Sequence, residues 1–160
     1  MARHLYLLVF PTRASKINGT RSHWAIFIPD IVDTSIGKLI QVLGTPFTGY
    51  GLKFRRNYNI STIAETFEQV LLGEVDEKWT EKAEEKRKMS TDVNPRDEVE
   101  RLAKRVEVPG VSREPLNPLV GRRCQEWTRD FVDLLIGKGI LDGSAIGVLD
   151  RVKDAEGKQL

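Results

Sequence analysis

The chain has little cysteine: Cys124 is the only one among its 160 residues. A single thiol excludes an intramolecular disulfide and a zinc site of the usual multi-cysteine kind. A reducing compartment fits this composition, so we expect a cytoplasmic protein. No apolar run approaches the roughly 20 residues of a membrane span. The apolar stretch 5–10 is too short for a secretory signal and ends at Pro11, so we expect neither a leader nor a transmembrane segment.

The chain also lacks a strong excess of charge of one sign. It has 25 Lys and Arg residues against 23 Asp and Glu residues, so the formal net charge is only +2. A dedicated nucleic-acid-binding domain is usually far more basic, so we do not expect nucleic acid as a partner. The basic residues at 53–56 and 122–123, with Tyr50 and Tyr58 near the first group, leave a small nucleic-acid-binding domain as one alternative.

The N-terminal half of the sequence has the pattern of strands. Its length and its apolar content of 40% are typical of one domain with one core, so residues 1–160 are predicted to form a single domain. A polar loop is expected at 12–21, and residues 67–72 fit either a strand or a helix, with the strand preferred. Short apolar, β-branched or aromatic runs predict further strands at 5–10, 22–28, 38–43 and 50–58.

The C-terminal half has the pattern of helices. Asn94-Pro95 predicts a helix with Asn94 at the N-cap and Pro95 at the first helical position. Before it, residues 74–93 are rich in Glu and Lys and predict a solvated helix or a mobile charged excursion. Residues 121–137 show the clearest helical spacing of apolar side chains. A short final helix at 144–153 and a polar C-terminal tail complete the expected organisation.

Cys124 lies in the first turn of the predicted helix 121–137, on its apolar face. Unpaired backbone N–H groups and the helix dipole favour a negative charge at that position. The neighbouring Arg122 and Arg123 add positive potential, and together these features stabilise a thiolate. A lone cysteine on an apolar helix face is nevertheless often a small core residue. The position alone therefore leaves a nucleophile and a packing residue as alternatives.

His23 lies in the predicted strand 22–28, on the same face as Ala25 and Phe27. A histidine within an apolar strand needs partners for both ring nitrogens, and a satisfied core histidine is the alternative to a catalytic one. A cysteine at a helix N-terminus, packed on a strand that carries a histidine, is a recurring arrangement in nucleophilic catalysis. We therefore predict that Cys124 and His23 face each other as a thiol–imidazole pair.

Two motifs connect these residues to a known superfamily: HWAIFI at residues 23–28 and RCQEWTRDFV at residues 123–132. In this order they resemble the circularly permuted branch of the NlpC/P60 papain-like superfamily, whose familiar members are lecithin:retinol acyltransferase and its small phospholipid-acting relatives. In that branch the histidine strand comes first and the cysteine begins a late helix. The similarity extends over about residues 5–140. The whole chain is also similar to small uncharacterised fungal proteins, which implies no activity.

The resemblance implies an α+β papain-like fold, an antiparallel sheet with a packed helix that bears the cysteine. It implies Cys124 as the nucleophile and His23 as the base that takes its proton and later protonates the leaving group. The family's third residue is polar and often a histidine. Here the next strand offers Gln41 and Lys38, and Gln41 is preferred because its amide oxygen can accept the ring N–H. The oxyanion hole is expected to use the Cys124 N–H and a second donor that the sequence does not identify.

These residues together predict a thiol hydrolase or acyltransferase that acts on an amide, ester or thioester through a cysteine acyl-enzyme. The substrate would be a small molecule or a peptide. A lipid is not implied, because the tail 150–160 is polar and no C-terminal transmembrane helix follows the cysteine helix. No cofactor and no metal ion is expected. The alternative is a catalytically inactive papain-like fold that serves as a binding or interaction module, with His23 and Cys124 as packing residues.

Overall fold

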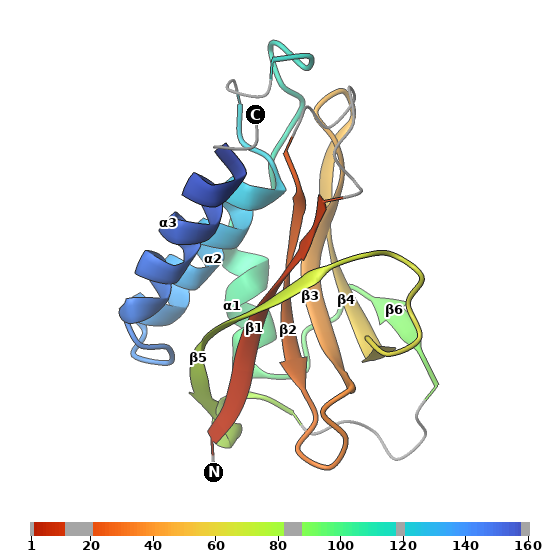
Figure 1. Ribbon diagram of the computed structural model, residues 1–160, viewed down its shortest axis with the longest axis vertical. Helices are drawn as coiled ribbons and strands as arrows, with labels where there is room; N and C mark the ends of the chain where they lie inside the picture. Colours follow the sequence, from red (N-terminus) through yellow and green to blue (C-terminus); the bar gives the residue numbers. More distant parts are fainter. Residues whose placement is uncertain (1, 12–20, 82–87, 118–120, 158–160) are drawn as a thin grey trace.

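The N-terminal half forms strands because its apolar residues come in short runs separated by turn residues. The computed structural model describes residues 2–11, 21–81, 88–117 and 121–157 (Figure 1). Within these residues, six antiparallel strands form one sheet in the order β5-β1-β2-β3-β4-β6. The strands are β1 (Ala2–Phe10), β2 (His23–Pro29), β3 (Ile36–Thr45), β4 (Gly49–Asn59), β5 (Glu68–Asp76) and β6 (Ser90–Asp92).

The four strands predicted at 5–10, 22–28, 38–43 and 50–58 are confirmed as β1 to β4. Each extends beyond the apolar run that indicated it, because its pairing with a neighbouring strand continues past that run. The preferred strand at 67–72 is confirmed as β5. Gly73 lies inside β5, opposite Leu5 of β1, and does not end the strand. The loop expected at 12–21 falls almost wholly outside the described residues.

Three helices lie together against one face of the sheet (Figure 1). The cysteine helix predicted at 121–137 and the last helix predicted at 144–153 are confirmed, the latter running further than expected. Within the described residues, no helix is both long and apolar enough to cross a membrane. The helices are α1 (Glu98–Arg105), α2 (Cys124–Gly137) and α3 (Ser144–Gly157).

The predicted start of the first helix is wrong. The N-cap is Asp97, whose side chain accepts a hydrogen bond from the Glu100 N–H at 2.8 Å. Asn94 is held in the chain that leads out of β6. Its N–H donates to the Asp92 carboxylate at 3.1 Å, and its carbonyl accepts from the Arg56 guanidinium at 2.9 Å. The helix therefore begins later in the chain than predicted, after the segment that contacts the edge of the sheet.

Of the expected charged helix or mobile excursion at 74–93, the structure describes residues 74–81 and 88–93, and these residues form no α-helix. β5 continues to Asp76, a 3-10 helix, η2 (Glu77–Trp79), follows, and β6 pairs with β4. Arg3 holds the segment after η2, since its guanidinium donates to the Thr80 hydroxyl at 3.2 Å and to the Glu81 carbonyl at 2.9 Å. The segment therefore packs back onto β1, while residues 82–87 lie outside the described part.

The two faces of the sheet bury different side chains. Trp24 and Ile26 of β2 belong to the large core that the helices cover, and Cys124 belongs to the same core. Ala25 and Phe27 belong to a smaller core on the opposite face. His23 follows this alternation, and its ring lies 5.8 Å from that of Phe10, a member of the smaller core. The cysteine and the histidine thus approach each other from opposite faces, at the point where β2 begins.

A buried ionic cluster joins α1 to β3 and β4. Glu100 is fully buried, and its Oε2 accepts from Lys38 Nζ and from Arg56 Nη1, both at 2.6 Å. Lys38 also binds Asp97. Burial opposes ionisation of Asp97, but the Lys38 charge and several hydrogen bonds hold the pKa of this carboxyl below its usual value. Lys38 therefore serves this cluster, and of the two residues that the sequence offered as partners of His23, only Gln41 is available.

Candidate functional site

Cys124 is the first residue of α2, which confirms its predicted place in the first turn. The helix supplies no acceptor for the N–H of its first residue, so this group is directed out of the helix end. Glu126 caps the end, because its Oε1 accepts from the Arg123 N–H at 3.2 Å. Gly121 permits the preceding turn with a φ of 85°, and a Cβ there would lie 2.9 Å from Ser112 Oγ.

The start of α2 is bound to the start of β2. The Ser22 carbonyl accepts from Gln125 Nε2 at 3.1 Å and from Cys124 Sγ at 3.9 Å. Arg21 donates to Gln125 Oε1 at 3.3 Å and to Glu126 Oε1 at 2.8 Å. These contacts set the position of the sulfur relative to the first residues of β2. They link residues more than 100 positions apart in the chain.

His23 is oriented by Gln41 on the neighbouring strand β3. Its Nε2 lies 2.7 Å from Gln41 Oε1, and both side chains are buried. Since an amide oxygen can only accept a hydrogen bond, Nε2 carries the proton and donates it. Nδ1 is then the acceptor of the neutral ring. The structure thus places Gln41 in contact with His23, and the role of His23 as a base stays a prediction.

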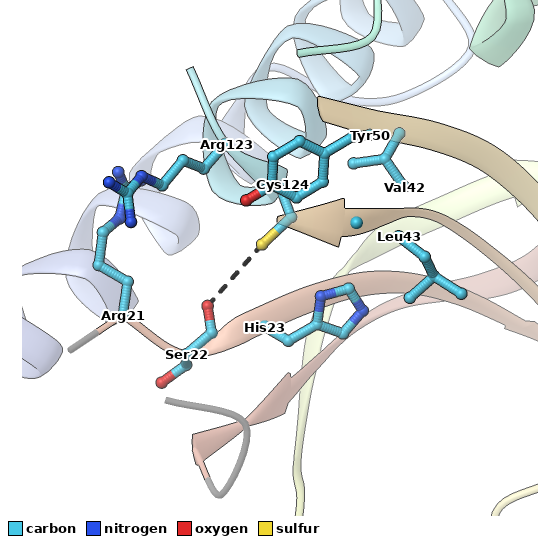
Figure 2. Close-up of a pocket in the computed structure, with 9 residues that line it drawn as sticks. Arg21, Ser22, His23, Val42, Leu43, Tyr50, Arg123 and Cys124 are labelled. Atoms are coloured by element: carbon cyan, nitrogen blue, oxygen red, sulfur yellow. Dashed lines mark hydrogen bonds between the residues drawn. The ribbon is translucent and has the colours of Figure 1, made fainter. Parts of the chain in front are cut away.

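The sulfur of Cys124 and the ring of His23 open onto one small pocket (Figure 2). Its volume is about 80 Å³, enough for several water molecules or a small acyl group. The structure therefore brings the two predicted residues to one site, and proton transfer between them stays a prediction. The pocket is lined by Arg21, Ser22, His23, Val42, Leu43, Gly44, Tyr50, Arg123 and Cys124.

Tyr50 is a site residue that the sequence did not identify. It lies near the start of β4, and its hydroxyl points toward Cys124 in Figure 2. Burial raises the pKa of Tyr50 to about 12, a negative charge at Cys124 adds to this rise, and the positive charges of Arg123 and Arg21 oppose it. The phenol is therefore a neutral hydrogen-bond donor at physiological pH.

The β3–β4 hairpin holds Tyr50 in place. Gly44 in the hairpin has a φ of 150°, and a Cβ there would lie 2.1 Å from the Gly49 carbonyl oxygen. The Tyr50 N–H donates to the Pro109 carbonyl at 2.9 Å. In the sequence, the only local indication that Tyr50 lies beside a hairpin turn is its position just after Gly49. The contact with Pro109 depends on the fold and has no sequence signature.

The family model of DUF6540, described as a family of unknown function, matches residues 5–142. The chain belongs to the DUF6540 family. The matched region contains all four of Cys124, His23, Gln41 and Tyr50. No curated protein and no solved structure matches the chain. The relation of this DUF6540 member to papain-like enzymes stays a prediction.

Three of the basic residues that suggested a nucleic-acid alternative, Arg55, Arg56 and Arg122, have separate acidic or aromatic partners in this DUF6540 protein. Arg56 binds the buried Glu100 and also Asp92, and Arg122 pairs with Asp130 at 2.5 Å. Arg55 lies over the ring of Tyr58 at 5.7 Å. The contacts of these residues therefore favour structural roles over a shared phosphate-binding face.

Metal ligands are not grouped in the part of the chain that the structure describes: no three His, Cys, Asp or Glu side chains come together there.

Proposed function

We propose that this DUF6540 protein is a cysteine-dependent hydrolase or acyltransferase with a papain-like arrangement of nucleophile, base and orienting amide. One observation carries the proposal. His23 donates Nε2–H to Gln41 and lines the same pocket as Cys124, which begins a helix. A buried histidine held in this tautomer presents its acceptor nitrogen for a thiol proton. A packing histidine would also need a hydrogen-bond partner, so what favours catalysis is the place of this oriented ring and of Cys124, at a helix start, on one pocket.

The reaction follows from these positions. The Cys124 thiol gives its proton to His23 Nδ1, and the thiolate attacks the carbonyl carbon of an amide, ester or thioester. The tetrahedral intermediate collapses as His23 returns the proton to the leaving amine, alcohol or thiol. A thioester between Cys124 and the acyl group remains. Water or another nucleophile, deprotonated by His23, then attacks the thioester and releases Cys124.

Tyr50 supplies the donor that was missing from the predicted oxyanion hole. The Cys124 N–H at the start of α2 and the Tyr50 hydroxyl would both donate to the oxygen that becomes negative in the intermediate. The pKa of Tyr50, about 12, keeps the phenol protonated at neutral pH. The hydrogen bond from Tyr50 becomes stronger as the carbonyl oxygen gains negative charge. It therefore stabilises the transition state more than the bound substrate.

Acetylation of Cys124 tests the proposed function. We expect 4-nitrophenyl acetate to transfer its acetyl group to Cys124, with release of one 4-nitrophenolate, followed by slower turnover. Intact-mass and peptide analysis would locate the adduct. Neutral hydroxylamine should remove it, since hydroxylamine cleaves a thioester and leaves acetyl-lysine. A Cys124→Ala variant controls for acetylation elsewhere. If the folded wild-type protein forms no hydroxylamine-sensitive adduct at Cys124, the binding-module alternative takes the place of the enzyme.

A Tyr50→Phe variant is expected to acetylate on the order of 10²-fold more slowly, because one of two oxyanion donors is lost. Iodoacetamide alkylation of Cys124, which forms no oxyanion, should change little in the same variant. Tyr58→Phe is the matched control, since Tyr58 is also a tyrosine of β4 but is buried in the smaller core. Equal acetylation rates in Tyr50→Phe and Tyr58→Phe would contradict the assigned role of Tyr50.

A further inference from the structure

The charged side chains that line the pocket are both arginines, Arg21 and Arg123. Among the described residues that line the pocket, none is an aspartate or a glutamate. Tyr50 adds no negative charge at neutral pH, because its pKa lies at about 12. The charge presented by the lining side chains is therefore positive.

Hydrogen bonds hold the guanidinium groups of both arginines in place. Arg123 is 2% exposed, and its Nη2 donates to the carbonyls of Pro115 at 3.1 Å and Asn117 at 2.7 Å, which orient the guanidinium without adding charge. The carboxylate of Glu126 binds the guanidinium of Arg21 and caps α2 through the Arg123 N–H. The Glu126 carboxylate thus offsets the charge of Arg21, and the Arg123 guanidinium, bound to neutral carbonyls, keeps the lining positive.

The charges of both arginines, with that of Glu126 in the opposite sense, act on Tyr50, whose hydroxyl points toward Cys124 (Figure 2). The space is small, about 80 Å³, so a substrate group that meets the arginines must lie within a few bonds of the carbon that the sulfur attacks. A site of this kind attracts a substrate anion and repels a cation.

Building on the acyl transfer proposed above, we infer that the substrate carries a carboxylate close to its scissile carbonyl, on the side of Arg21 and Arg123. The arginines would select this anionic acyl compound over its neutral analogue. Their field would also draw it into the pocket with the carbonyl next to Cys124 Sγ. The substrate class is therefore a carboxylate-bearing amide, ester or thioester.

Two alkylating agents of nearly equal size test the inference. Iodoacetate carries a carboxylate next to its reactive carbon, and iodoacetamide carries a neutral amide there. In both reactions an S–C bond forms with Cys124, the C–I bond breaks and iodide leaves. We expect the ratio of the iodoacetate rate to the iodoacetamide rate to be about threefold or more above that of the neutral thiol 2-mercaptoethanol. Added salt should reduce the excess.

Variants of the charged residues assign the effect. Arg21→Gln should lower the rate ratio, whereas Arg21→Lys, which keeps the charge, should retain it. Glu126→Gln should raise the ratio, because it removes a negative charge and glutamine can still form the capping box. Arg129→Gln is the matched control: Arg129 also belongs to α2 but pairs with Asp150, away from the pocket lining.

The possible outcomes separate this inference from the proposed function. A ratio equal to that of 2-mercaptoethanol, or one that neither Arg21→Gln nor Glu126→Gln moves, overturns the inference while the acetylation result stands. If Arg21→Gln fails to fold, the rise expected for Glu126→Gln still decides the matter. A Cys124 that reacts with neither reagent overturns the proposed function and this inference with it.

Discussion

A Glu100→Ala variant should lose about 3–5 kcal/mol of its free energy of unfolding, which is the usual cost of removing one partner from a buried ion pair. Glu100 is fully buried and binds both Lys38 and Arg56 at 2.6 Å. Without its carboxylate, two buried cations share only Asp97 and Asp92, which lie nearer the surface. Urea unfolding at neutral pH, followed by circular dichroism, measures the loss.

Glu98→Ala is the control on the same helix. Glu98 pairs with Arg101 at 3.1 Å, and both side chains are exposed. An exposed pair contributes about 1 kcal/mol or less, so this variant should remain close to the wild type in stability. Glu100→Gln keeps the shape of the side chain and one acceptor oxygen, so its free energy of unfolding should lie between those of Glu100→Ala and Glu98→Ala. A Glu100→Ala variant as stable as Glu98→Ala would contradict the structural role of the cluster.

Most of the sheet and the cysteine helix could be predicted because their signals are local. The apolar run of residues 22–28 indicates a buried strand whatever the rest of the chain does, and the spacing within 121–137 indicates a helix with one buried face. The start of α1 could not be predicted in this way. Asn94 and Asp97 are both good N-caps, and the choice depends on Arg56 and Lys38, which belong to distant strands.

Some residues of the candidate site could likewise be predicted from local signals, and others could not. Cys124 and His23 could be found because a helix N-terminus and a histidine within an apolar strand are visible in the sequence. Gln41 followed from its place on the next strand, and the structure places it 2.7 Å from His23. Tyr50 could not be found, because its place depends on the hairpin closed at Gly44 and on a hydrogen bond to the distant Pro109.

The sequence also could not predict that Cys124 and His23 approach each other from opposite faces of the sheet. Alternation along β2 places His23 on the smaller core, and the pattern of α2 places Cys124 in the larger one. Only the end of the sheet allows the two to share a pocket. The contacts of the Ser22 carbonyl with α2 bring the helix to that end. A residue-by-residue pattern contains no information about where a helix meets the end of a strand.

Near pH 6.5, acetylation of Cys124 should be about 10²- to 10⁴-fold slower in a His23→Ala variant than in the wild type. This decrease in rate is typical for the loss of a general base, on the order of 10²- to 10⁴-fold. Without the imidazole, the thiol must ionise unaided, and a free cysteine with a pKa near 8.5 is only about 1% thiolate at pH 6.5. Release of 4-nitrophenolate under single-turnover conditions measures the rate. The wild-type rate should already be high at this pH.

The pH profile separates catalysis by His23 from a packing role. At pH 9 most ordinary thiols are ionised, so the difference between His23→Ala and wild type should narrow by about tenfold or more. His4→Ala is the control, because His4 is the chain's other histidine and its side chain is half exposed. A folded His23→Ala variant that reacts as fast as His4→Ala at pH 6.5 would show that His23 is a packing residue. A rate difference that stays constant between pH 6.5 and pH 9 would point to a distorted pocket and would remove His23 from the mechanism as its base.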